Sequence, residues 1–158
     1  MACCDSYDGL ADYQLGLYAT GDYLALHGRI TGLADLHEHT LIGYVDAVLD
    51  VPPLRILDEL VPEHRAQIQT NNIAGQWLAA GASLGVAALP VYIGDADRRL
   101  VRVLAETVTL KRTYWLVVPR DIRRLARVCA VVEILRALAA THRGLVTPDS
   151  FPEPTRNP

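Results

Sequence analysis

The sequence has few cysteines, few aromatic residues and no long apolar run. Of its 158 residues, three are cysteine, one is methionine and one is phenylalanine. Two cysteines are adjacent, Cys3 and Cys4, so a disulfide framework is not expected, and Cys129 is predicted to be a small core residue. No stretch reaches the roughly 18 apolar residues of a membrane-spanning helix, and no export signal opens the chain. We therefore expect a cytoplasmic protein.

The charges of the chain are nearly balanced. Fifteen lysines and arginines stand against 18 acidic residues, which gives a formal net charge of −3. This charge provides no general field for attracting a phosphate backbone, so the composition does not favour nucleic-acid binding. With 51% hydrophobic residues, a chain of this length can bury a sizeable core. We expect one compact unit with disordered ends at residues 1–9 and 145–158.

Hydrophobic periodicity predicts alternating strands and helices, the pattern of the α/β class. Strands are expected at residues 15–19, 40–45, 65–70, 85–90, 100–104 and 108–118. Helices are expected at residues 23–27, 33–39, 54–60, 71–82, 91–94 and 121–142. Gly28 is predicted to end the first helix and Asn71 to cap the helix at 71–82.

Three segments together resemble a known family. They are residues 17–28 (LYATGDYLALHG), residues 72–90 (NIAGQWLAAGASLGVAALP) and residues 112–124 (RTYWLVVPRDIRR). In the second, an apolar helical pattern passes through glycines into a short buried strand that ends at a proline. In this order the segments resemble the effector-binding domain of LysR-type transcriptional regulators, and the resemblance covers residues 10–144.

The resemblance implies an α/β fold like that of type 2 periplasmic binding proteins, with a small-molecule effector held between two lobes. Residues 15–19 and 109–118 would be the two strands that cross between lobes. Residues 20–104 would form a nearly complete second lobe, and the helix at 121–142 would return to a partial first lobe. No winged helix-turn-helix and no first half of the first lobe precede residue 10. The resemblance therefore implies a regulator truncated at its amino terminus, without direct nucleic-acid binding of its own.

A junction between a strand and a helix is the main candidate for an effector site. Thr70, Asn71 and Asn72 precede a predicted helix, whose free N–H groups and positive dipole end suit the carboxylate of a small organic acid. The resemblance places this junction in the cleft. Thr20 occupies a second junction of the same kind. The alternative is that these residues only cap helices or form local turns.

Two tyrosines are further candidates for effector binding. The resemblance places Tyr18 and Tyr114 on the crossing strands, where they could flank the effector. Packing in the core is the alternative for both.

No pattern in the sequence predicts a catalytic residue, a metal site or a cofactor. His37 and His39 would point about 200° apart on a helix or to opposite faces of a strand, with no third ligand nearby. Ser6 and Ser83 lack the motif of an activated nucleophile. The four arginines near residue 121 are expected to form a solvated charged face. They are Arg120, Arg123, Arg124 and Arg127. We therefore do not expect an enzyme.

Three functions remain open. The first is a sensor of a small organic acid that acts as a homo-oligomer or together with a full-length regulator. The second is a free-standing solute-binding protein, which the same fold could serve. The third is an interaction module without a ligand, in which self-association covers exposed sheet edges.

Overall fold

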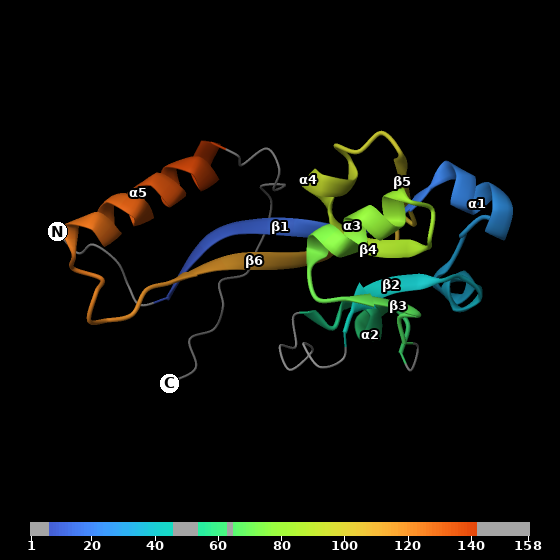
Figure 1. The fold of residues 1–158 in the computed structure, drawn as a ribbon, viewed down its shortest axis with the longest axis horizontal. Coiled ribbons are helices and arrows are strands. Elements are labelled where there is room, and N and C mark those ends of the chain that lie inside the picture. The colour runs from blue at the N-terminus through green and yellow to red at the C-terminus, as the bar shows by residue number, and fades with distance from the viewer. Residues whose placement is uncertain (1–6, 46–53, 63–64, 142–158) are drawn as a thin grey trace. The chain divides into compact units, whose positions relative to one another are not determined.

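The computed structural model describes residues 7–45, 54–62 and 65–141. Contacts divide the chain into two compact units. Unit 1 comprises residues 1–13 and 113–158, and unit 2 comprises residues 14–112. Two strands, β1 (Tyr7–Thr20) and β6 (Leu110–Val117), run through both units and pair with each other (Figure 1). The disorder predicted for residues 145–158, and for most of 1–9, concerns residues outside the described part of the chain.

Unit 2 alternates short helices with short strands, as the sequence predicts. Its elements after β1 are α1 (Gly21–His27), the 3₁₀ helix η1 (Leu33–Glu38), β2 (Leu41–Tyr44), α2 (Ile56–Leu60), β3 (Ile68–Thr70), α3 (Ile73–Gly81), β4 (Val86–Pro90), α4 (Val91–Gly94) and β5 (Leu100–Val103). Unit 1 contains the carboxyl-terminal helix α5 (Ala126–Thr141). The predicted α/β class is confirmed.

The strands form one mixed sheet in the order β3-β2-β4-β1-β5. β2 runs parallel to β3 and β4, whereas β1 runs antiparallel to β4 and β5. Because parallel strands end at the same edge, the carboxyl ends of β2, β3 and β4 lie together. Tyr44 is paired with Thr70 there, and Leu15 of β1 is paired with Pro90. Helix α3 starts at this edge, directly after β3.

The core of unit 2 lies between the sheet and α3. Tyr18, Ile42 and Leu89 belong to a buried cluster against which Ile73 and Trp77 of α3 pack. The spacing of four residues between Ile73 and Trp77 puts both on one face of the helix. β1 is apolar on both faces in this unit, because adjacent residues Leu17 and Tyr18 are both almost fully buried.

The structure corrects one helix cap. Asn72, not Asn71, caps α3: its side-chain Oδ1 accepts a hydrogen bond from the Gly75 N–H at 2.7 Å. Asn72 has the extended backbone of a cap residue, with φ −151° and ψ 157°. Two adjacent asparagines have the same capping chemistry, so the sequence cannot decide between them. The predicted end of α1 is confirmed, because Gly28 has φ 100° and its N–H bonds the Leu24 carbonyl.

The predicted start of the last helix was wrong by five residues. Residues 121–125 form turns, in which the Ile122 N–H bonds the Pro119 carbonyl and the Leu125 N–H bonds the Ile122 carbonyl. Apolar residues three apart suit such successive turns as well as an α-helix, so the pattern does not separate them. Cys129 in α5 is disulfide-bonded, contrary to the prediction of a plain core residue. In the described ranges, no helix is long and apolar enough to cross a membrane.

A buried tyrosine and histidine join α1 to the start of β2. The Tyr23 hydroxyl accepts a hydrogen bond from the Thr40 N–H at 2.9 Å and lies 3.3 Å from Nδ1 of His39. Tyr23 also stacks on His27, with 4.4 Å between ring centroids. His39 is only 4% exposed. Burial, and then the proximity of His27, lower the pKa of His39 below its usual value of 6.5.

We expect the stability of the protein to decrease as the pH falls below about 6.5 because of His39. Its folded pKa is lowered, so the unfolded chain takes up a proton first; stability is retained above the unfolded pKa and lost as the pH falls toward the folded pKa. Urea unfolding at about pH 7.5 and about pH 5.5 measures this loss. His39→Gln should reduce it, whereas His37→Gln, at an exposed position, should not. An equal loss in the wild-type protein and His39→Gln would contradict the assignment.

Candidate functional site

The junction between β3 and α3 is held by a local hydrogen-bond network. The Thr70 hydroxyl donates to the Asn72 carbonyl at 2.9 Å and accepts from the Asn72 N–H at 3.1 Å. The Asn72 side-chain amide donates to Oδ1 of Asn71 at 2.7 Å. Both asparagines are exposed. The structure therefore brings the three predicted residues together in one ordered turn at the carboxyl edge of the parallel strands.

A glycine in the first turn of α3 lets the helix approach the end of β3. A Cβ atom added at Gly75 would lie 2.5 Å from the Thr70 Oγ1, which is closer than real Cβ contacts allow. The Asn72 side chain satisfies the Gly75 N–H, and the first-turn N–H groups of Ile73 and Ala74 have no acceptor within the helix. These two donors, together with the positive end of the helix dipole, can hold an anion.

A side-chain donor in the first half of the same helix is also unsatisfied. Gln76 is 1% exposed, and its side-chain Nε2 has no hydrogen-bond partner among the described residues. A buried amide group without an acceptor is costly, and native structures usually supply one. The sequence did not predict a role for Gln76, because a glutamine in a helix shows its burial only after the fold is known.

Thr20 lies at the opposite edge of the sheet from Thr70. Since β1 is antiparallel to β4, Leu15 pairs with Pro90 at the carboxyl edge of β4, and Thr20 is five residues further along. At about 3.3 Å per residue this is a separation of roughly 16 Å along the strand. One small effector cannot contact both Thr20 and Thr70.

The surroundings of Thr20 are those of a helix cap. Its Oγ1 accepts from the Tyr23 N–H at 3.1 Å and shares a 2.6 Å hydrogen bond with the Ser83 hydroxyl. Thr20 is 5% exposed, and α1, which it caps, has only seven residues. Ser83 lies 63 residues further along the chain, so no local pattern predicts this contact.

The two tyrosines proposed from the sequence lie in different units. Tyr18, in unit 2, is 1% exposed, and its hydroxyl donates to Oδ1 of Asp95 at 2.7 Å. Burial and the Asp95 carboxylate raise the pKa of Tyr18 far above its ordinary range. Tyr114, in unit 1, is 42% exposed and stacks on Tyr13 with ring centroids 4.3 Å apart.

No group of three or more histidine, cysteine or acidic residues could hold a metal ion within the described ranges. His39 is buried and His37 is exposed, so their side chains point in different directions.

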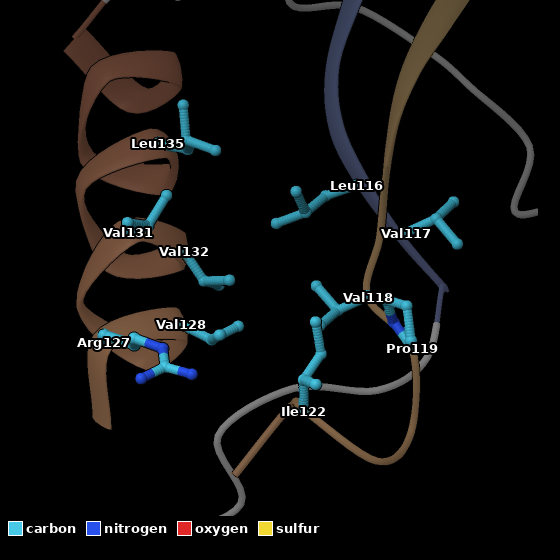
Figure 2. Close-up of a pocket in the computed structure, with 10 residues that line it drawn as sticks. All are labelled: Leu116, Val117, Val118, Pro119, Ile122, Arg127, Val128, Val131, Val132 and Leu135. Atoms are coloured by element: carbon cyan, nitrogen blue, oxygen red, sulfur yellow. The ribbon is translucent and has the colours of Figure 1, made fainter. Parts of the chain in front are cut away.

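A pocket in unit 1 was not predicted from the sequence. It has a volume of about 390 Å³ and lies between α5 and the end of β6 (Figure 2). Its lining is Leu116, Val117, Val118, Pro119, Ile122, Arg127, Val128, Val131, Val132 and Leu135. Nine of these ten side chains are apolar and one is charged, so the pocket suits apolar groups rather than a polar metabolite.

Solved structures that match the fold include regulatory domains of transcriptional regulators. The regulatory domain of CrgA, a LysR-type transcriptional regulator from Neisseria meningitidis, matches with a TM-score of 0.69 at 19% identity, over 84% of this chain and 68% of that domain. Full-length CrgA matches with a TM-score of 0.67 at 20% identity, over 88% of this chain and 50% of that protein. The effector domain of AmpR from Pseudomonas aeruginosa matches with a TM-score of 0.66 at 23% identity, over 89% and 69%.

The fold is therefore that of a periplasmic-binding-protein-like regulatory domain. The model of the LysR substrate binding domain family matches residues 6–140, and the chain belongs to this family. It spans about two thirds of the isolated regulatory domains and half of full-length CrgA. No curated protein matches the chain in sequence. The resemblance found in the sequence is confirmed.

Proposed function

We propose that this chain senses a small organic carboxylate as the effector-binding part of a LysR-type transcriptional regulator. The observation that carries the proposal is the start of α3, where the N–H groups of Ile73 and Ala74 follow the ordered turn of Thr70, Asn71 and Asn72. In open α/β sheets, ligands bind outside the carboxyl ends of the strands, which is where this turn lies. Gln76, whose buried amide has no partner among the described residues, lies in the same helix three residues after Ile73.

We propose that the effector acts by population shift. A ligand that binds one arrangement of the two units better than another favours that arrangement by the difference in binding free energy. β1 and β6 are the strands through which such a change would pass, because they run through both units. In this proposal the chain works in the cytoplasm as an oligomer or with a full-length regulator, and the DNA contact comes from that regulator.

Calorimetry with aliphatic and aromatic carboxylates, each paired with its neutral amide, tests the ligand class. We expect at least one carboxylate to bind and its amide to bind at least about tenfold more weakly, because the helix end favours a negative charge. If an amide binds as tightly as its acid, the proposed anion site is wrong. If no carboxylate produces heat, an interaction module without a ligand is the better interpretation.

Two substitutions at Asn72 separate capping from binding. Asn72→Ala removes the acceptor for the Gly75 N–H, so we expect a loss of about 1 kcal/mol in the free energy of unfolding together with weaker carboxylate binding. Asn72→Asp keeps a capping oxygen but adds a negative charge beside the anion. It should preserve stability and still weaken carboxylate binding. Urea unfolding and calorimetry measure the two effects, and unchanged binding in Asn72→Asp would place the ligand elsewhere.

A gel-shift experiment tests the source of the DNA contact. We expect the 158-residue chain alone to show no salt-resistant, sequence-specific binding to promoter DNA. Tight specific binding by the chain alone would contradict this part of the proposal.

A further inference from the structure

Unit 1 exposes apolar side chains of the kind that folded proteins usually bury. Trp115, Val131 and Ile134 are 58%, 55% and 59% exposed. By contrast, Leu17, Leu41 and Leu89 in unit 2 are fully buried. Large apolar patches on a protein surface mark interaction sites more often than solvated faces. We refer to α5, the end of β6 and the pocket between them as the unit 1 groove.

The two walls of the groove are both apolar. On α5, Val128, Val131, Val132 and Leu135 follow the i, i+3, i+4, i+7 spacing and form one apolar ridge. Figure 2 shows Leu116 of β6 directed toward this ridge. An apolar ridge at this spacing is the surface against which a second helix packs.

The volume of the groove fits side chains of another polypeptide. Its volume of about 390 Å³ is large enough for several aliphatic side chains, and its mostly apolar lining favours their burial. Exposed Ile134, three residues after Val131 on α5, extends the apolar surface beyond the residues that line the pocket. A small molecule in the pocket would leave Ile134 in water, whereas a protein segment can cover it as well.

Residues 119–128 contribute four of the residues that line the pocket, and we call this segment the rim of the groove. The rim is basic, which restricts the partner. Residues 119–128 contain four arginines and one aspartate, although the whole chain has a net charge of −3. Arg120, Arg124 and Arg127 are exposed, and Arg127 lines the pocket. Two copies of this groove facing each other would bring the two basic rims together. An acidic partner would instead be attracted to the rim.

We propose that the unit 1 groove binds an amphipathic, acidic helix of another polypeptide. Apolar residues of that helix enter the pocket along the α5 ridge, and aspartate or glutamate residues on its flanks meet the arginines of the rim. This is the helix-in-groove mode of peptide recognition, with charge setting the choice of partner. The proposal does not depend on the carboxylate site at α3, and the two can fail separately.

Fluorescence anisotropy with two synthetic helical peptides tests the proposal on the 158-residue chain. Both peptides are about 18 residues long and carry leucine at positions i, i+4, i+7 and i+11; one has glutamate at the flanking positions and the other has lysine. We expect the glutamate peptide to bind at least about tenfold more tightly than the lysine peptide, and its affinity to fall with added salt.

Variants at exposed positions locate the binding surface without disturbing the core. Val131→Glu should weaken binding of the glutamate peptide by about tenfold or more, since Val131 lines the pocket and is 55% exposed. Leu26→Glu is the matched control, because Leu26 on α1 is 80% exposed in unit 2. It should leave the affinity unchanged. Circular dichroism confirms that both variants are folded.

Several outcomes would overturn the proposal. Equal affinity for the two peptides would show that the partner need not be acidic. Equal weakening by Val131→Glu and Leu26→Glu would show that the peptide does not bind in the groove. A wild-type dimer that Val131→Glu converts to a monomer would make a second copy of this chain the occupant. Binding by residues 1–141 but not by the 158-residue chain would make the chain's own carboxyl-terminal residues the occupant.

Discussion

Leu89→Ala is expected to lower the free energy of unfolding by about 2 to 5 kcal/mol. Leu89 lies in β4, which pairs with β2 on one side and β1 on the other. Its side chain is fully buried in the cluster that also contains Tyr18 and Ile42. Hydrogen bonds to a strand on each side limit how far the backbone of β4 can move to fill the space. The loss should therefore include a cavity contribution beyond the transfer free energy of the removed carbon atoms.

Urea unfolding followed by the fluorescence of Trp77 measures this loss, because Trp77 packs against the same cluster. Leu26→Ala is the matched control. Leu26 is 80% exposed, so the same substitution there should change stability by no more than about 0.5 kcal/mol. Equal effects of the two substitutions would mean that the cluster around Leu89 is not the core of unit 2.

Gly85→Ala is expected to destabilise the protein by about 3 kcal/mol. A Cβ atom at this position would lie 2.3 Å from the backbone oxygen of Thr40. The same oxygen accepts a hydrogen bond from the Val86 N–H at 2.8 Å, at the point where β4 begins beside β2. A backbone carbonyl cannot rotate away as a flexible side chain can. The methyl group must therefore separate the two strands at their first hydrogen bond.

Gly21→Ala provides the control for Gly85→Ala. A Cβ atom at Gly21 would meet no atom within 4 Å, and Gly21 opens α1, where alanine is a good helix former. We expect this control to be neutral or to stabilise the protein by up to about 1 kcal/mol. Urea midpoints of both variants, compared with the wild-type protein, measure the difference. A Gly85→Ala protein as stable as Gly21→Ala would show that β2 and β4 do not approach as closely as described.

Local patterns predicted the elements well where apolar residues and punctuating residues agree. The predicted strand at residues 85–90 appears as β4 (Val86–Pro90), and the short helix α4 has the predicted bounds. The predictions agreed less well with the structure where two adjacent residues have the same side-chain chemistry. The cap of α3 falls on Asn72 rather than Asn71, because only the backbone conformation distinguishes them. β1 starts at Tyr7, well before the predicted strand, because it also pairs with β6.

The positions of the candidate site residues in the sheet could not be predicted from the sequence. Thr20 and Thr70 both stand between a strand and a helix, and the sequence gives them the same chemistry. The structure puts them at opposite edges of the sheet, since β1 is antiparallel to β4 while β3 and β4 are both parallel to β2. The direction of a strand relative to its neighbours depends on pairing between distant residues.

The sequence by itself determined the family, the α/β alternation and the chemistry of the junction at Thr70, Asn71 and Asn72. These properties depend on residues that are close in the chain, so hydrophobic periodicity and the residue types at turns predict them. Only the tertiary structure decided which junctions share an edge, which glycines lie against another strand and where an apolar groove with a basic rim forms. Those features depend on contacts between distant segments, and a pattern of buried and exposed residues does not specify which distant segments meet.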